Sequence, residues 1–313
     1  LVGNYGIPDL NAVDKDGISK FFESDTMQIR GLVVHELSQT ASHWNLKMTL
    51  DEWMYNEKVP GISGIDTRAI TKKLTTSGVM MAALVVSDEE IDVEKIKKEL
   101  ANITTYNSEK FMDIVSTKEE KIYGHENNSV VVIDTGAKNA IVRNVRELGY
   151  KAIVVPWNTP FDKVMSHKPK GVVLSSGPGD PQNCPDTIDT AKKLIENNVP
   201  TLGICLGAQI IGIAGNTETY KLKYGHRGQN KPCVNLETNQ VYVTSQNHGY
   251  GIKPESLEKS DFKLWFANAD DDTVEGIKHK TKNCIAVQFH PEAAPGPFDC
   301  KYVFDELKKL MEK

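Results

Sequence analysis

The sequence predicts an α/β fold, in which helices cover both faces of a mostly parallel β-sheet, joined to a smaller N-terminal α/β domain. Three observations predict it. Short unbroken apolar runs recur through the C-terminal part, as in strands that are buried on both faces. Amphipathic helical stretches separate these runs, which is typical of parallel strands with crossover helices. The length of 313 residues is enough for two domains with their own cores.

The C-terminal part has the more regular pattern. Four apolar runs are the predicted parallel strands: residues 130–134, 152–155, 171–174 and 201–205. Helical spacing of apolar residues predicts helices between or after them, and a closing helix: residues 139–148, 187–197, 206–214 and 304–311. Three later runs are predicted as further strands, of which the first two resemble extensions of the sheet: residues 240–245, 263–267 and 284–289.

The first part of the chain has fewer regular signals. One helix is predicted over residues 69–74, with Asp66 or Thr67 as its N-cap. Residues 117–128 are polar and can contribute little to a core. This composition predicts a domain at 1–116, a linker at 117–128 and a second domain at 129–313. Because the chain opens at Leu1 in what reads as a folded segment, the first domain is expected to be truncated at its start.

Composition excludes several classes of protein. The net charge of −5 and the interleaving of acidic with basic residues argue against a nucleic-acid partner. The most apolar window, residues 199–215, contains Gln209, Thr201 and four glycines, so it reads as a buried strand, turn and helix rather than a membrane span. Five scattered cysteines favour free thiols in a reducing, cytoplasmic compartment, and their spacing with histidines suggests no metal site.

Cys205 lies between Gly203 and Gly207 where a predicted strand meets a predicted helix. A nucleophile on such a sharp turn projects above the sheet, and only glycine fits on either side of it. The N-terminus of the following helix favours a thiolate and a developing oxyanion. A buried structural cysteine is the ordinary alternative, but the flanking glycines and the helix start favour a nucleophile.

His290, Pro291 and Glu292 follow directly after another buried strand. Residues two apart in an extended segment point the same way, so Glu292 can orient one imidazole nitrogen while the other faces a thiol. This is the arrangement of nucleophile, base and orienting group that activates cysteine. A structural histidine at a strand end is the alternative, and the adjacent carboxylate argues against it.

Two further polar segments end predicted strands. Residues 175–181 form a glycine-rich loop that could bring backbone N–H groups to an anion, although Gly-Pro-Gly is also a common turn. This loop lacks the pattern of a nucleotide-binding P-loop. Residues 245–250 offer an amide, a small residue and an aromatic ring that could recognise an amino acid, and a hairpin turn would explain them equally well.

Together these segments resemble the class I glutamine amidotransferases, which use a catalytic triad. Within that group, nearly the whole chain resembles the small, glutamine-hydrolysing chain of carbamoyl-phosphate synthetases. Residues 177–181, 203–207 and 290–292 match the shared glutaminase core. The subfamily resemblance rests on residues 2–6, 60–68, 246–250 and 295–297, since related glutaminases lack the first domain.

The resemblance implies a role for each site residue. Cys205 would attack the glutamine amide to form a thioester, His290 would transfer the proton and Glu292 would orient His290. Backbone N–H groups of Leu206 and Gly177 would form the oxyanion hole. The residues around glutamine would be Gly177, Gly179, Leu206, Gln209, Asn247, Gly249 and Tyr250. No cofactor is implied in this chain, because ATP and bicarbonate would be used by a partner, the synthetase large chain or a fused synthetase domain.

Two departures from the family pattern matter for this expectation. Where the family commonly has histidine, this chain has Ala208. The family also uses a serine from a segment that precedes Leu1. The resemblance therefore leaves three alternatives: a glutaminase for anthranilate, guanylate or cytidylate synthesis, a non-catalytic scaffold that binds the synthetase, and a cysteine peptidase, for which no extended peptide groove is indicated.

Overall fold

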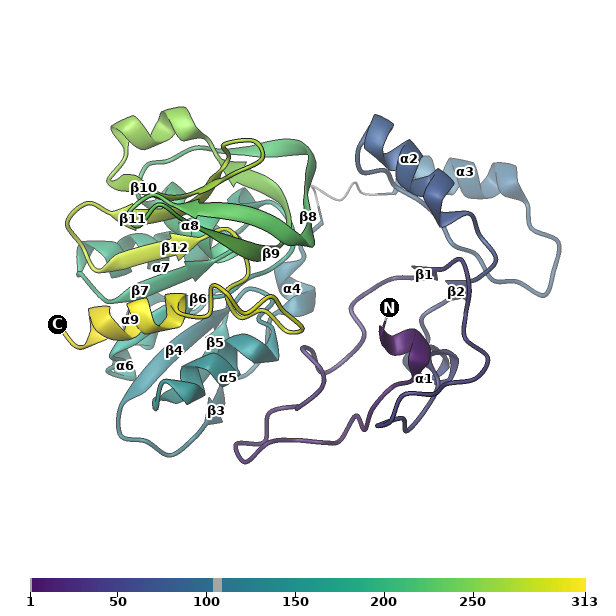
Figure 1. Ribbon diagram of the computed structural model, residues 1–313, viewed down its shortest axis with the longest axis horizontal. Helices are drawn as coiled ribbons and strands as arrows, with labels where there is room; N and C mark the ends of the chain where they lie inside the picture. Colours follow the sequence, from purple (N-terminus) through teal and green to yellow (C-terminus); the bar gives the residue numbers. More distant parts are fainter. Residues whose placement is uncertain (1, 104–108) are drawn as a thin grey trace. The chain divides into compact units, whose positions relative to one another are not determined.

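The computed structural model describes residues 2–103 and 109–313. It divides into two compact units, Leu1–Glu109 and Lys110–Lys313. The second unit contains one ten-stranded sheet and most of the buried apolar side chains. Figure 1 shows this sheet with helices packed against it. The α/β class and the helices on both faces of the sheet are confirmed.

The sheet has the strand order β3-β5-β4-β6-β7-β12-β11-β10-β8-β9. Its strands are β3 (Lys121–Tyr123), β4 (Ser129–Asp134), β5 (Lys151–Pro156), β6 (Gly171–Leu174), β7 (Thr201–Ile204), β8 (Thr219–Asn235), β9 (Gln240–Ile252), β10 (Phe262–Asn268), β11 (Val274–His279) and β12 (Cys284–Val287). The central strands β5, β4, β6, β7 and β12 pair in parallel. Their carboxyl ends therefore lie at one edge of the sheet, where ligands of such folds bind.

Helices cover both faces of this parallel part. They are α4 (Met112–Val115), α5 (Asn139–Glu147), α6 (Phe161–Ser166), α7 (Pro185–Glu196), α8 (Leu206–Ala214) and α9 (Val303–Met311). Side chains of α6, α7 and α8 share a buried cluster with Val131 and Ile133 of β4, while α5 and α9 lie on the other side of the sheet (Figure 1). Two short 3-10 helices, η3 (Pro181–Asn183) and η4 (Pro254–Lys259), complete the unit.

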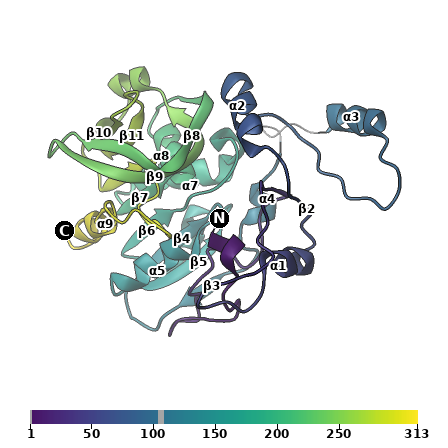
Figure 2. The ribbon, with the colours of Figure 1, turned by 45° about the vertical axis from the view of Figure 1, so that its right-hand side comes forward.

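The antiparallel part of the sheet is larger than the sequence indicated. Five strands continue the sheet beyond or beside the parallel part: β11, β10, β8 and β9 follow β12, and β3 pairs with β5 at the far edge. Figure 2 shows β3 and β5 at one end of this unit and β8 and β10 at the other. Three of the five strands, β3, β8 and β11, were not predicted. The predicted strand 240–245 extends as β9 to Ile252, so residues 246–250 lie within a strand and not in a hairpin turn.

The predicted linker at residues 117–128 belongs to the second compact unit, whose first residue is Lys110. Within it, β3 pairs with β5 from Lys121 to Tyr123. In the residues before β3, Met112 is buried and Thr117 donates its N–H to the Asp134 carboxylate at 2.7 Å. The boundary between the units therefore falls at 109/110. The polar composition of the segment reflects an exposed edge strand, whose side chains need no core.

The described part of the first unit contains η1 (Val2–Tyr5), β1 (Leu32–Val33), α1 (Leu50–Glu57), β2 (Gly61–Ile62), α2 (Thr67–Ser77) and α3 (Val93–Asn102). The strands β1 and β2 pair in parallel. The expected cap of α2 is Asp66, which accepts a hydrogen bond from the Ala69 N–H at 2.9 Å. A capping box formed by Thr49 and Glu52 starts α1.

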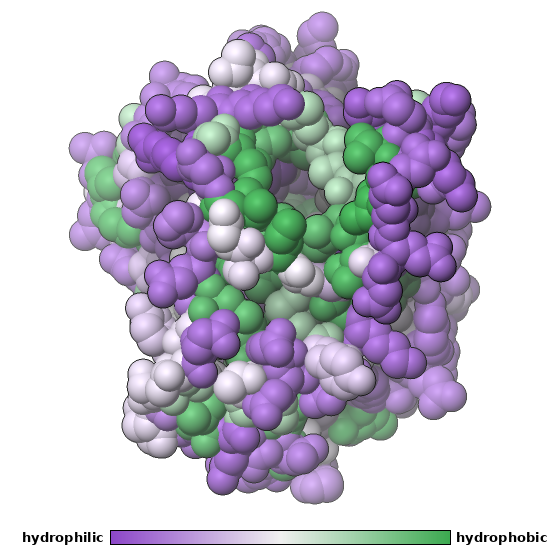
Figure 3. Space-filling view, turned by 90° about the vertical axis from the view of Figure 1, so that its right-hand side faces the viewer, coloured by the Kyte–Doolittle hydropathy of each residue, from purple (hydrophilic) through white to green (hydrophobic). Residues whose placement is uncertain are grey.

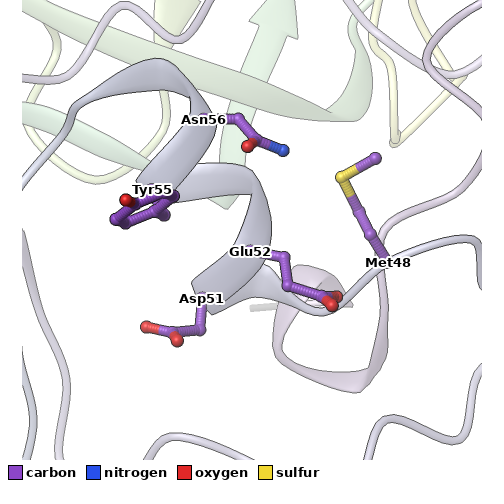
Figure 4. Close-up of a pocket in the computed structure, with 5 residues that line it drawn as sticks. All are labelled: Met48, Asp51, Glu52, Tyr55 and Asn56. Carbon is purple, nitrogen blue, oxygen red and sulfur yellow. The ribbon is translucent and has the colours of Figure 1, made fainter.

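Few apolar side chains are buried in the described part of the first unit, namely Ile7, Ile18 and Met54. Several others are open to solvent, among them Val79 and Val86, and Figure 3 shows apolar groups at the surface of the face turned to the viewer. A pocket of about 350 Å³ lies along α1, lined by Met48, Asp51, Glu52, Tyr55 and Asn56 (Figure 4). Its carboxylate Glu52 already serves the helix cap, and Tyr55 is 84% exposed, so this pocket is an open surface feature.

Two global features bear on the sequence-based expectations. All five cysteines are free and buried. Within residues 2–103 and 109–313, no helix is long and apolar enough to cross a membrane.

Candidate active site

Cys205 lies on the turn between β7 and α8, at the carboxyl edge of the parallel strands. Its backbone is in the left-handed region, with φ of 53° and ψ of −105°, a conformation that typically costs about 1–3 kcal/mol for a residue with a side chain. The neighbouring strand β12 helps to hold the turn, because the Cys205 N–H donates to the Val287 carbonyl at 2.8 Å. The side chain is only 3% exposed.

The two glycines that flank Cys205 are required by close backbone contacts. A Cβ atom on Gly203 would lie 2.7 Å from the Gly207 carbonyl oxygen, and one on Gly207 would lie 2.2 Å from the Leu174 carbonyl oxygen. Both distances are far below van der Waals contact. The helix can therefore start directly above the strand end only with glycine at both positions.

His290 and Glu292 follow β12, the parallel neighbour of β7. The Nδ1 atom of His290 lies 2.7 Å from a carboxylate oxygen of Glu292. Cys205 interacts with the same imidazole and raises its pKa, and because Nδ1 faces Glu292, Nε2 is the nitrogen left for the sulfur. The structure thus brings together the sulfur, imidazole and carboxylate that the sequence analysis singled out.

The charges of these groups reinforce each other. Burial opposes the charged form of His290, but the negative charges of Glu292 and Cys205 outweigh burial and raise the His290 pKa. Burial would likewise raise the pKa of Glu292, whereas His290 and Lys138 lower it below its ordinary value. An imidazolium between a carboxylate and a sulfur is the ion-pair arrangement that activates a cysteine nucleophile.

Burial suppresses the reactivity of the other four cysteines. Burial raises the pKa of Cys184 and Cys300 to about 12 and that of Cys233 and Cys284 even higher. They are therefore inert thiols at neutral pH, since the thiolate is the reactive form.

Lys138 is a site residue that the sequence analysis missed. Its ammonium lies 3.4 Å from the Glu292 carboxylate and also donates to the Ala293 carbonyl. Lys138 precedes α5, at the carboxyl edge of β4. It thereby adds a positive charge behind Glu292, whose side chain is fully buried. A lysine at a predicted helix start carries no signal of this kind in the sequence alone.

The two predicted oxyanion donors lie side by side. Leu206 is the first residue of α8, so its N–H has no acceptor within the helix. Gly177 packs against it: a Cβ atom on Gly177 would lie 2.9 Å from Leu206 Cδ2 and 1.9 Å from the Thr135 carbonyl oxygen. Thr135 also holds the loop through hydrogen bonds with Ser175 at 2.9 Å. Gly179 lies further along this loop, with φ of 96° and the Phe111 ring beside it.

Gln209 is nearly completely buried, at 2% exposed. Its amide nitrogen donates to the Tyr250 carbonyl at 2.9 Å and to Gln288 Oε1 at 3.1 Å. The predicted glutamine contact therefore uses its amide nitrogen to hold β9 and to bind Gln288, another residue that the sequence analysis missed.

The predicted contacts on β9 are divided by the alternation of the strand. Gln246, His248 and Tyr250 are buried, whereas Asn247 is exposed and Gly249 is partly exposed. Successive side chains of a strand point to opposite faces, so Asn247 and Gly249 face away from the row that contains Tyr250. The Asn247 carbonyl lies 4.0 Å from the sulfur of Cys205, which places this part of β9 beside the nucleophile.

One group of described side chains has the composition of a metal site, although the sequence spacing suggested none. His226, His248 and Glu275 bring their ligand atoms within 4.8 Å of one another. However, each ring nitrogen of His226 faces a carboxylate, Glu275 at 3.2 Å and Asp271 at 2.9 Å. The hydrogen bond with Glu275 outweighs burial and raises the His226 pKa. Both ring nitrogens of His226 are thus already engaged by carboxylates, so this cluster is a hydrogen-bonded brace between strands.

Comparisons with known proteins agree with this geometry. Residues 131–310 match the family model of class-I glutamine amidotransferases, and residues 1–84 match that of the carbamoyl-phosphate synthase small chain. A crystal structure from Thermoplasma acidophilum, whose description assigns it to a GMP synthase, superposes with a TM-score of 0.51 at 27% identity, covering 60% of this chain and 94% of that one.

Similar proteins match the chain over its whole length. The carbamoyl phosphate synthase small chain of Pyrococcus furiosus is 42% identical over 100% of this chain and 83% of its own length. That of Methanocaldococcus jannaschii is 42% identical over 100% and 84%, and that of Clostridium acetobutylicum is 37% identical over 99% and 84%. The resemblance inferred from the sequence motifs is confirmed, and this chain belongs to the carbamoyl-phosphate synthase small chain family, with a class I glutamine amidotransferase domain in its C-terminal part.

Proposed function

We propose that this chain hydrolyses L-glutamine to glutamate and ammonia, and that the ammonia serves carbamoyl phosphate synthesis by a partner synthetase. The observation that carries the proposal is the convergence of Cys205 and His290 at the ends of the paired strands β7 and β12, with Nδ1 of His290 2.7 Å from Glu292. Membership of the small chain family supports the same activity.

The reaction follows from this arrangement. The Cys205 sulfur attacks the carbon of the glutamine side-chain amide, and its C=O electrons move to oxygen. The N–H groups of Leu206 and Gly177 stabilise the oxyanion. His290 gives its proton to the leaving nitrogen, the C–N bond breaks, and ammonia and a thioester result. His290 then takes a proton from water, whose oxygen attacks the thioester and releases glutamate and the Cys205 sulfur.

Glutamine binding is assigned to the surfaces on either side of Cys205. The loop with Gly177 and Gly179 lies on the side of Leu206, and the exposed face of β9 with Asn247 and Gly249 lies on the other. In this proposal Gln209 and Tyr250 act from behind β9, through their mutual hydrogen bond.

The partner is a carbamoyl-phosphate synthetase large chain or a fused synthetase domain, which would use ATP and bicarbonate. The relatives are named small chains, which supports the existence of a larger partner chain. In this proposal the chain itself needs no cofactor, acts in the cytoplasm and docks through its N-terminal domain.

The test is glutamine hydrolysis measured with and without the synthetase partner. Cys205→Ser should abolish hydrolysis and glutamine-dependent carbamoyl phosphate formation, while ammonia-dependent formation by the partner continues. Cys184→Ala, which removes a buried thiol that no step uses, serves as the matched control. Full glutamine hydrolysis by Cys205→Ser would refute the proposal.

A non-catalytic scaffold role is not favoured by any contact at the site. One hint of such a role was Ala208, which is 1% exposed and packs in the apolar cluster of α6, α7 and α8. An alanine there leaves Cys205, His290 and Glu292 in place. Stoichiometric labelling of Cys205 by an electrophilic glutamine analogue, with protection by glutamine, separates an active site from a scaffold.

A further inference from the structure

Strand β9 is attached to the catalytic groups through three of its carbonyl oxygens. The His290 N–H donates to Ser245 at 2.9 Å, the Cys205 sulfur lies 4.0 Å from the Asn247 oxygen, and the Gln209 amide donates to Tyr250 at 2.9 Å. These contacts set the distance between the nucleophile and the strand that bears Asn247 and Gly249. Of the three, only the contact from Gln209 comes from a side-chain amide, which has to be oriented.

Gln288 supplies that orientation. Its Oε1 atom accepts the second N–H of the Gln209 amide at 3.1 Å, so both hydrogens of this amide are used, one for Tyr250 and one for Gln288. Gln209 and Gln288 are each 2% exposed, so bulk water cannot reach the pair to take over either bond. Without Gln288, one buried N–H of Gln209 would lose its partner, and such a group is costly to leave unsatisfied.

The backbone of Gln288 is itself well anchored. Its N–H donates to the Glu275 carbonyl of β11 at 2.8 Å, and it stands two residues before His290. At the other end, the Gln209 N–H donates to the Cys205 carbonyl at 3.2 Å. The pair of amides therefore connects the segment of His290, the helix that begins at Cys205 and strand β9.

The amide nitrogen of Gln288 supports a functional reason for having glutamine at this position. Its Nε2 atom is buried and has no hydrogen-bond partner among the described residues. An apolar side chain of similar size would avoid that cost, because a buried donor without a partner destabilises the fold. Polar groups that break a packing rule of this kind are characteristic of functional sites.

We propose that Gln288 is a positioning residue for glutamine binding, which holds Gln209 and, through it, the Asn247–Tyr250 segment of β9 beside Cys205. The inference rests on the proposed function, since it assigns a role within the same site. Gln288 touches neither the reacting atoms nor the triad side chains in this role. Its removal should weaken the binding of glutamine and leave the chemical step intact.

The test is a double-mutant cycle with Gln288→Met and Gln209→Met, which preserve length and remove the amides. It is carried out on the full chain reconstituted with its synthetase large chain. Gln288→Met should raise the KM for glutamine about tenfold, the effect of one buried hydrogen bond, and change kcat less than about twofold. In the Gln209→Met background, Gln288→Met should have no further effect on KM, because its target is already absent.

Thr190→Val is the matched control. Thr190 lies on α7, is 1% exposed, and donates its hydroxyl to the Thr159 carbonyl at 3.1 Å. The change therefore also removes one buried hydrogen bond. It should lower the thermal midpoint as Gln288→Met does, without changing KM. A KM for Gln288→Met equal to that of the native chain, or KM effects of the two glutamine changes that add independently, would overturn the role of Gln288 and leave the proposed function standing. A native chain that neither hydrolyses glutamine nor reacts with an electrophilic glutamine analogue would overturn both.

Discussion

At the scale of single residues, the site depends on one strained residue and one buried charged pair. The positive φ of Cys205 is held by the bond to Val287 and by the close packing of Gly203 and Gly207. His290 and Glu292 are buried together, and each stabilises the charged form of the other against the cost of burial. Removing one partner of such a pair leaves an uncompensated group in the interior.

Glu292→Gln should therefore lower the pKa of His290, because it removes one of the charges that hold the imidazole protonated. The imidazolium form of His290 then loses its proton at a lower pH than in the native chain. We expect kcat to fall about 10- to 1,000-fold, with a smaller change in KM. NMR titration of the ring of residue 290 measures the change in pKa, and steady-state kinetics measure the changes in kcat and KM. An unchanged titration would contradict the assigned role of Glu292.

The sequence allowed Cys205, His290 and Glu292 to be singled out because local chemistry marks each of them. The glycines mark the turn of Cys205, and the carboxylate two residues on marks His290. Lys138 and Gln288 carry no such mark. Lys138 matters because it contacts Glu292, and Gln288 matters because it contacts Gln209. In both pairs the partners lie far apart in the sequence. Contacts of this range depend on the tertiary fold and cannot be read from spacing.

At the scale of elements, the strand and helix that flank Cys205 meet more closely than residues with side chains would allow. The contact of Gly207 with the carbonyl of Leu174 is the tightest part of this junction apart from the loop at Gly177. It joins the start of α8 to the end of β6, the strand beside β7. The geometry of the nucleophile thus depends on a backbone contact as well as on side chains.

Gly207→Ala should destabilise the fold, although alanine is normally favoured over glycine in a helix by about 1 kcal/mol. The added methyl group would lie 2.2 Å from the Leu174 oxygen, and overpacking of this kind costs about 1–3 kcal/mol or more. Chemical denaturation measures the loss. Ala214→Gly, at the other end of α8, is the control and should cost no more than about 1 kcal/mol. A Gly207→Ala protein as stable as the native chain would show that the junction can relax.

The connection between β3 and β4 is held by a pair of charges. Arg146 of α5 donates through both terminal nitrogens to the Glu126 carboxylate. This bond is the largest cause that lowers the pKa of Glu126 to about 2. Because the folded-state pKa lies below the ordinary value of 4.5, the pair stabilises the fold above pH 4.5 and ceases to do so as the pH falls towards 2.

Glu126→Gln should therefore lower the thermal midpoint at neutral pH and have a diminishing effect as the pH is lowered from 4.5 to 2. The comparison is between native and variant chains in thermal unfolding followed by circular dichroism. A difference in midpoint that stays constant over this range would rule out ionisation of Glu126 as its origin. Glu119→Gln, a substitution at an exposed acid in the same polar segment, provides the control.

The elements that could be predicted are those with a strong apolar signal. The buried strands β4 to β7 and the helices between them were identified because both of their faces require apolar side chains. Strand β8 was missed because its sequence, from Thr219 to Asn235, is polar and largely exposed or partly exposed. It forms through backbone pairing with β9 over most of its length, and pairing of this kind leaves little trace in hydrophobic periodicity.

At the scale of the whole molecule, the two units differ in how much apolar surface they bury. The buried side chains lie almost entirely in residues 110–313, and three of the apolar ones belong to the described part of the first unit. Since burial of apolar surface is the main source of stability, the second unit has what it needs to fold independently. Composition alone predicted two domains, but the boundary depends on contacts made by the segment before β3.

These contacts lead to a prediction about fragments of the chain. A fragment that starts at residue 110 keeps Phe111, Met112 and Val115 in or against the core. It also keeps the bonds from Thr117 to Asp134 and from the Trp157 N–H to Ser116. A fragment that starts at residue 129, the domain start expected from composition, loses all of them together with β3.

We expect the fragment 110–313 to unfold cooperatively and the fragment 129–313 to be less stable by about 3–6 kcal/mol, the sum of a buried methionine, two partly buried apolar side chains and two hydrogen bonds. Because whole domains are stable by only about 5–15 kcal/mol, such a loss would leave the shorter fragment partly unfolded at physiological temperature. Urea denaturation of both fragments measures the difference.

The same fragments also test whether the segment at residues 110–128 supports the site, because Phe111 packs against Gly179 and Val115 against Gly136, next to the loop of Gly177. Labelling of Cys205 by a glutamine analogue should therefore be weaker in the shorter fragment even under conditions in which it is folded. Equal stability and equal labelling of the two fragments would contradict a domain start at residue 110 and support the boundary predicted in the polar segment at 117–128.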